Sequence, residues 1–205
     1  MMKKLYRIIP LLVGISGLIY MTSCTEDNSD QYGAYEEDRY FDIYMAANYP
    51  DASAQASGLY YLENTEGTGI MPGDSTWVLI NHVAYIIPDD IVYETYLENV
   101  AVDNRIQDTS ALYGPYKIKN GLYNEGFTEG LSMMREGGEA TLLFTSELGY
   151  GSESTGKVSA YSSLKYEVKL LEVLGDDIEA YEAEKIVDGL NMLTHMLDVQ
   201  DLEVE

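Results

Sequence analysis

The chain has 205 residues, and its 35 aspartates and glutamates against 12 lysines and arginines give a formal net charge of −23 at neutral pH. This length fits one globular domain with extensions. So acidic a chain repels phosphate backbones and anionic lipid headgroups, which excludes nucleic acid as an expected partner and leaves no electrostatic route to a membrane.

The first 23 residues have the layout of an export signal. Three basic residues precede an apolar run over 8–21, which a proline and two glycines interrupt and which is short for a transmembrane span. The sequence Met-Thr-Ser-Cys at 21–24 resembles the bacterial lipobox, at which cleavage leaves the cysteine as the acylated N-terminus. The resemblance implies a signal peptide over 1–23 and lipid on Cys24. The protein would then be lipid-anchored in the cell envelope, at the outer membrane, on the periplasmic face or at the cell surface. The alternative is an uncleaved signal anchor with an incidental cysteine.

Cys24 is the only cysteine, which excludes an intrachain disulfide and a structural zinc site built on thiolates. Residues 24–34 open with an acidic polar run that has nothing to bury, so they are predicted to be a flexible tether. Removal of the signal also removes its three basic residues and takes the formal charge from −23 to −26. Attachment to the lipid bilayer would therefore depend on acyl chains, and stable anchoring takes more than one such chain.

Residues 35–57 are predicted to form an N-terminal helical extension. Between 35 and 47, apolar side chains recur at helical spacing, at Tyr40, Ile43, Tyr44 and Ala47. This spacing predicts a short amphipathic helix with those residues on its apolar face, ending at Pro50.

A run of strands is predicted from Gly58 onward. The strands are expected at 58–63, 76–87, 91–95 and 116–119, with an irregular stretch between the last two. The segment 76–87 is long and mostly apolar, which is typical of a central strand.

A short helix is predicted next. Phe127, Leu131 and Met134 are spaced i, i+4 and i+7, which gives the helix one apolar face, and Gly137–Gly138 would terminate it. One short helix among several strands predicts an α+β domain, in which an antiparallel sheet packs on a helix.

Two more strands are predicted over 140–144 and 164–170. Apolar residues alternate in them with polar ones, so each strand is expected to be half-buried with charges such as Lys165 on a solvent face. Residues 175–205 turn helical again and are predicted to be a C-terminal helical extension, with an apolar stripe at Leu190, Leu193 and Leu197.

The segment 126–151 resembles the signature of the FKBP-type peptidyl-prolyl cis-trans isomerases. In that family Gly-Trp-x-Glu-Gly is followed by an Ala-x-Leu strand and Ala-Tyr-Gly, and this chain has Gly-Phe-Thr-Glu-Gly from 126 and Gly-Tyr-Gly from 149. Weaker matches lie at 78–85, 93–95 and 161–171. The resemblance covers 58–174 and implies an FKBP-like antiparallel β-sheet wrapped around a short helix, with N- and C-terminal helical extensions.

The resemblance also implies a catalytic pocket built from Tyr150, Phe127, Tyr93, Glu94 and Tyr166. Tyr150 would hold the peptide backbone of the ligand through its hydroxyl, and Phe127 would replace the tryptophan on which the proline ring rests. Tyr93 and Tyr166 replace two phenylalanines of the wall and add hydroxyls that need partners. Glu94 occupies the position of an aspartate in the family, so the carboxylate is kept on a longer side chain.

Five further positions are implied to bind substrate, namely His82, Tyr116, Tyr123, Asn124 and Val158. His82 falls where a tyrosine is usual, and Tyr123–Asn124 replace an apolar Val-Ile pair beside the floor. The loop after Gly151 lacks the Pro-Pro pair of the family. These departures predict a wetter pocket.

Prolyl isomerisation requires no metal, cofactor or nucleophile, and none is expected here. The two histidines are far apart and lack a carboxylate at ligand spacing, so no metal site is predicted. An X-Pro bond isomerises through a twisted imide across a barrier of roughly 18–20 kcal/mol. A water-poor aromatic pocket favours the twisted form. The leading hypothesis is a membrane-tethered peptidyl-prolyl cis-trans isomerase that assists the folding of exported proteins and binds their proline-containing polypeptide segments.

Two other functions stay open. The FKBP fold could act as a peptide-binding, protein-binding or chaperone module with little catalysis, which Asn124 and the missing Pro-Pro pair favour. A surface lipoprotein could instead bind glycan or another envelope component through exposed tyrosines, because the chain contains 19 of them. The sequence does not indicate an oligomeric state.

Overall fold

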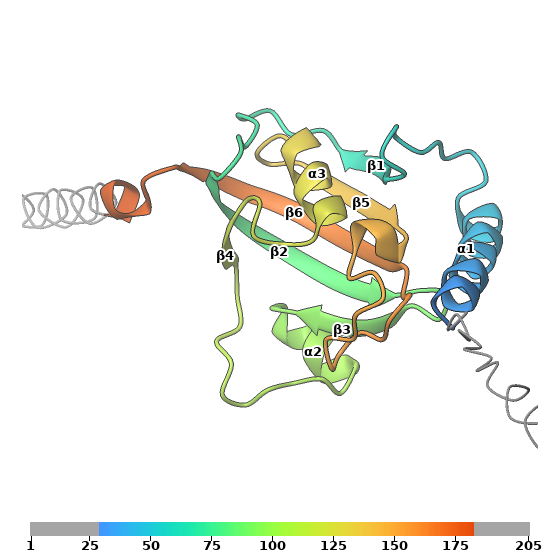
Figure 1. The fold of residues 1–205 in the computed structure, drawn as a ribbon. Helices are drawn as coiled ribbons and strands as arrows, with labels where there is room; N and C mark the ends of the chain where they lie inside the picture. The colour runs from blue at the N-terminus through green and yellow to red at the C-terminus, as the bar shows by residue number, and fades with distance from the viewer. Residues whose placement is uncertain (1–28, 183–205) are drawn as a thin grey trace, which may run out of the picture.

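The computed structural model describes residues 29–182, which form one antiparallel sheet with helices around it (Figure 1). The strands are β1 (Tyr60–Thr65), β2 (Trp77–Ile86), β3 (Ile91–Thr95), β4 (Tyr116–Lys119), β5 (Glu139–Phe144) and β6 (Leu164–Gly175). The helices are α1 (Ser29–Asn48), α2 (Glu98–Asp103) and α3 (Glu125–Met133), with a 3₁₀ turn, η1, at Ser146–Leu148. This architecture confirms the predicted α+β class with an antiparallel sheet and a short helix against it.

The sheet runs in the order β1-β5-β6-β2-β3, and β4 also pairs with β2. Two strands share one edge of β2, because β4 pairs with Trp77–Ile80 and β3 pairs with 83–86. The other edge of β2 pairs along its whole length with β6. The prediction of a central strand over 76–87 is therefore confirmed.

Helix α3 packs closely on β5 because two glycines face the strand. A Cβ on Gly130 would lie 2.5 Å from the Leu142 side chain, and one on Gly126 would lie 2.6 Å from the Phe144 ring. Phe127 and Leu131 are buried beneath the helix, as their spacing predicts. The helix ends at Met133, earlier than the predicted stop at 137–138, because Met134 is already extended and its amide donates to Leu131.

The second face of β5 is also covered, which the sequence did not indicate. Leu143 is fully buried, and it packs with Phe41, Tyr44 and Met45 of α1 in a second apolar cluster. The expectation of a solvent face on this strand is therefore wrong. Lys165 on β6 is buried for the same reason, and its ammonium lies 2.7 Å from the Asp90 carboxylate.

The apolar face predicted for α1 is wrong except at Tyr44. Tyr40 and Ile43 are 47% and 57% exposed, whereas Phe41 and Met45 are buried. The helix also begins at Ser29, inside the stretch predicted as a tether. Apolar residues lie on both sides of α1, so only its docking against Leu143 determines which side is buried.

Two predicted segments differ in extent. The stretch between β3 and β4 is not wholly irregular, because it contains α2. Residues 178–182 begin a helical turn, while Leu190, Leu193 and Leu197 lie outside the described residues, as do the signal peptide and Cys24. Within 29–182, no helix is both long enough and apolar enough to cross a membrane.

Candidate functional site

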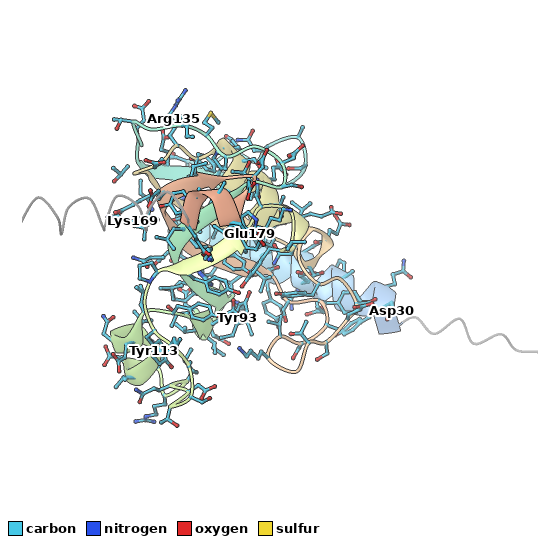
Figure 2. The ribbon with its side chains drawn as sticks, turned by 90° about the vertical axis from the view of Figure 1, so that its left-hand side faces the viewer. Asp30, Tyr93, Tyr113, Arg135, Lys169 and Glu179 are labelled. Atoms are coloured by element: carbon cyan, nitrogen blue, oxygen red, sulfur yellow. The ribbon has the colours of Figure 1, made fainter. Side chains whose placement is uncertain are left out.

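Three rings from separate elements meet between α3 and the sheet. Phe127 of α3 lies 4.9 Å, centroid to centroid, from Tyr166 of β6, and Tyr93 of β3 meets Tyr166 edge-on at 6.3 Å. Phe144 of β5 stacks on Tyr166 from another side. In Figure 2, Tyr93 lies in the lower half of the domain, between Arg135 at the top and Tyr113 at the bottom. The structure therefore brings Phe127, Tyr93 and Tyr166 together.

The hydroxyls of the two wall tyrosines are hydrogen-bonded to each other. Asn124 connects to the same pair, because its side-chain amide donates to the Tyr166 hydroxyl at 3.0 Å. Its carbonyl oxygen accepts the Phe127 amide at 3.0 Å and caps α3. Both polar groups of the Asn124 side chain, the amide and the carbonyl oxygen, are therefore hydrogen-bonded within the cluster.

Burial raises the pKa of Tyr93, and the adjacent Tyr166 raises it further. Burial likewise raises the pKa of Tyr166, and the neighbouring Tyr150 adds to this. Both wall tyrosines are therefore neutral at physiological pH. The cluster presents rings and paired hydroxyls and carries no phenolate charge.

Glu94 is the charged group beside the rings. Its carboxylate accepts a hydrogen bond from the Tyr123 hydroxyl and lies 3.3 Å from His82 Nε2. Burial alone would raise the pKa of Glu94, but the hydrogen bonds from His82 and Tyr123 outweigh it and lower the pKa. Glu94 is thereby held as a carboxylate, and the exposed ammonium of Lys157 lies 3.8 Å from it.

His82 is buried at the centre of the aromatic cluster. Its ring centroid lies 6.0–6.4 Å from five aromatic rings, which are those of Tyr96, Tyr116, Tyr123, Phe127 and Tyr166. Nε2 faces Glu94, while Nδ1 has no hydrogen-bond partner. His82 therefore contacts both the predicted catalytic residues, such as Phe127, and the predicted substrate-binding residues, such as Tyr123.

Tyr96 is a member of the cluster that the sequence did not identify. Its ring stacks face to face on Tyr116, with centroids 4.0 Å apart and planes 4° apart. Burial and a hydrogen bond with Tyr116 raise the pKa of Tyr96 to about 12. The sequence could have indicated Tyr96 through its position, because it directly follows the segment 93–95, which resembles the family, and a residue that follows β3 stays near the site.

An open hollow of about 350 Å³ borders this cluster, lined by Leu122, Tyr123, Asn124, Gly149 and Tyr150. Tyr150 is half-buried and packs against the main core. Phe127 does not line the hollow; it is only 1% exposed, and the ring of Tyr123 lies 4.9 Å from it. Tyr123 therefore lies over the ring that the sequence assigned as the floor.

Val158 does not line the hollow, because it is buried in the main core with Phe127 and Tyr166. The polar residues that predicted a wetter pocket do not all present free polar atoms to it. The polar atoms that Asn124, Tyr93 and Tyr166 add are hydrogen-bonded to one another. Across residues 29–182, no group of three or more aspartates, glutamates or histidines is arranged to hold a metal ion.

Comparison with known proteins shows which family the chain belongs to. Residues 89–171 match the family described as FKBP-type peptidyl-prolyl cis-trans isomerase. A probable FKBP-type peptidyl-prolyl cis-trans isomerase FkpA of Neisseria meningitidis is 32% identical over 120 residues, which is 58% of this chain and 39% of that protein. FK506-binding protein 1 of Aspergillus oryzae is 30% identical over 113 residues, which is 53% of this chain and 92% of that protein.

The crystal structure of FkpA from Escherichia coli superposes with a TM-score of 0.58 and 21% identity, covering 74% of this chain and 63% of that one. This likeness shows the fold. The matched part spans 39% of the length of the Neisseria relative, but it spans 92% of the Aspergillus protein. The chain therefore belongs to the FKBP-type peptidyl-prolyl cis-trans isomerase family.

Proposed function

We propose that this protein catalyses cis-trans isomerisation of X-Pro bonds in polypeptide segments that enter the hollow beside Tyr150. The observation that carries the proposal is the convergence of Tyr93, Phe127 and Tyr166 from three elements. This ring cluster contacts the hollow through two residues that line it, because Tyr123 packs on Phe127 and Asn124 donates to Tyr166. The barrier to isomerisation arises from amide resonance. Catalysis requires a site that binds the twisted imide better than the planar one.

The chemistry of the cluster suits this requirement. Twisting removes resonance and reduces the dipole of the imide, so an environment of rings favours the twisted form over the hydrated planar form. Phe127 and Tyr166 supply such an environment, and the raised pKa of Tyr166 keeps it uncharged. Tyr150 lines the hollow, and its hydroxyl would donate to a substrate carbonyl and hold the peptide while the bond turns.

The test is a protease-coupled or NMR isomerisation assay on an Ala-Xaa-Pro-Phe peptide, using residues from Thr25 onward. We expect the Tyr150→Phe, Phe127→Ala double variant to lose most of the activity, and Phe127→Leu serves where the alanine variant does not fold. Tyr113→Phe is the matched control, because its hydroxyl bonds the Asp108 amide in the loop before β4. Equal rates for wild type and the double variant would refute the enzyme proposal.

A second candidate is a binding module with little catalysis. The observation that favours it is the 1% exposure of Phe127, because a proline ring reaches that floor only after Tyr123 moves. Titration of a proline-containing peptide into labelled protein separates the two candidates. Shifts at Tyr150 and Asn124 without rate enhancement would favour binding alone.

We also propose that the mature protein is tethered to the cell envelope through lipid on Cys24, where it would assist the folding of exported proteins. The support is the lipobox-like segment 21–24 and its apolar run. Labelling cells with a palmitate analogue tests this: wild type should incorporate label and Cys24→Ser should not. Equal incorporation would contradict the anchor and would leave the isomerase proposal intact.

A further inference from the structure

The segment that carries Tyr150 is held at both ends by one buried carboxylate from α1. We name residues 146–163, which connect β5 to β6, the Tyr150 loop. Glu37 of α1 accepts hydrogen bonds from the Ser146 amide at 2.6 Å, from the Ser146 hydroxyl and from the Ser163 hydroxyl at 2.8 Å. Glu37 is 8% exposed, so these hydrogen bonds are shielded from water.

Two further residues on the same face of α1 contact the loop. Gly33 lies one turn before Glu37, and a Cβ there would be 2.5 Å from the Tyr161 ring, so only glycine permits this approach. Asp30 lies one turn earlier (Figure 2). Burial and then a hydrogen bond with the Asp30 carboxylate raise the pKa of Tyr161. Residues 30, 33 and 37 are spaced i, i+3 and i+7 and so form one stripe.

The loop residues that α1 contacts are those that fix the backbone next to Tyr150. The Gly151 amide donates to the Ser146 carbonyl at 2.8 Å, and the Tyr161 amide donates to the Gly151 carbonyl at 2.9 Å. Tyr161 has a positive φ of 55°, which a non-glycine residue adopts only when its surroundings hold it. Gly151 is therefore fixed from both sides by residues that α1 holds.

We infer that Glu37 is a positioning residue for prolyl isomerisation, which acts by fixing the loop that presents Tyr150 to the substrate. This inference depends on the proposed role of Tyr150. The apolar docking of α1 is separate, because Phe41, Tyr44 and Met45 pack on Leu143 one to two turns further along the helix. Replacing Glu37 should therefore loosen the loop while α1 stays in place.

The experiment compares wild type with Glu37→Ala, Glu37→Gln and Asp38→Asn. Asp38 is the matched control, because it is the next carboxylate on the helix and is exposed. The first readout is hydrogen exchange of residues 146–163 measured against that of α3 and β6. The Tyr150 loop should exchange faster in Glu37→Ala, α3 and β6 should stay unchanged, and Asp38→Asn should match wild type.

The second readout is kcat/KM in a double-mutant cycle with Tyr150→Phe. Misplacement of a substrate-positioning group by about 1 Å can cost on the order of 100-fold, so Glu37→Ala should lose between about tenfold and 100-fold. Glu37→Gln keeps one acceptor oxygen and should recover part of the loss. In the Tyr150→Phe background, Glu37→Ala should change kcat/KM by less than about twofold, because the positioned group is already missing.

The outcomes separate this inference from the proposed function. An active wild type with Glu37→Ala equal to Asp38→Asn in both readouts would overturn the inference alone. An equal loss in the presence and absence of the Tyr150 hydroxyl would also overturn it, because a merely structural role would act in both backgrounds. An inactive wild type would refute the isomerase proposal and the positioning role with it, whatever the loop exchange shows.

Discussion

Replacing Tyr123 by valine should increase isomerase activity. The Tyr123 ring lies over Phe127, and its hydroxyl donates to the Glu94 carboxylate, so the side chain is held across the proposed floor. A proline ring that settles on Phe127 must displace Tyr123 and break both interactions. Valine is too short to cover the floor and makes neither contact.

The size of the effect follows from what displacement costs. An aromatic pair contributes about 0.5–1.5 kcal/mol beyond its buried area. A hydrogen bond to a charged group contributes about 1.5–3 kcal/mol. Displacement of Tyr123 therefore costs at least about 2 kcal/mol, which corresponds to roughly 30-fold in kcat/KM. Tyr123→Phe removes only the hydrogen bond and should recover about tenfold.

The assay is protease-coupled isomerisation at several peptide concentrations, with urea unfolding of each variant to show that it remains folded. Leu112→Ala is the control, since Leu112 is an apolar residue that is 92% exposed and does not line the hollow. We expect the order Tyr123→Val, then Tyr123→Phe, then wild type and Leu112→Ala together. A decrease in both Tyr123 variants would refute the reasoning and would show that Tyr123 holds the substrate instead of blocking it.

Two further predictions concern stability. Tyr166→Phe leaves the buried Tyr93 hydroxyl without its partner and should lower the free energy of unfolding by about 1–3 kcal/mol in a urea titration. Tyr35→Phe, at a side chain that is 63% exposed, should change it by less than about 0.5 kcal/mol. Equal losses would contradict the buried pair. The pKa of Glu94 is lowered from its ordinary 4.5, so its contribution to stability is present above that pH and is lost as the pH falls through its folded value. The free energy of unfolding of Glu94→Gln should therefore depend less on acid pH than that of wild type, as measured by urea unfolding at a series of acid pH values.

Local periodicity predicted the fold where one side of an element faces the core. The i, i+4, i+7 spacing of Phe127, Leu131 and Met134 identified the buried face of α3. Met133, the other large apolar residue of that short helix, also packs against the main core and so does not define a competing face. The same reasoning failed on α1, where Tyr40 and Phe41 are equally suited to burial. The choice between them is made by Leu143, a contact between residues about 100 positions apart that periodicity cannot contain.

The matched signature predicted which rings meet, but not which ring covers which. Phe127, Tyr93 and Tyr166 converge as the resemblance implied. Tyr123 was expected to bind substrate, and it does line the hollow, but it also lies over the floor. Nothing in the local sequence of Glu37 distinguishes it from Asp38, because its partners lie more than 100 residues away.

The polar substitutions in this site come in sets that satisfy one another. Taken singly, a tyrosine for a phenylalanine or Asn124 for an apolar residue adds a group that is costly to bury. Taken together, the Asn124 amide donates to Tyr166, whose hydroxyl pairs with Tyr93, and no hydroxyl of that pair is left unpartnered. Replacing one member by the family residue leaves the other members without a hydrogen-bond partner. Replacing the whole set removes donors and acceptors together. The cost of burying these polar groups is therefore a property of the whole network, and it cannot be inferred from the polarity of any one position.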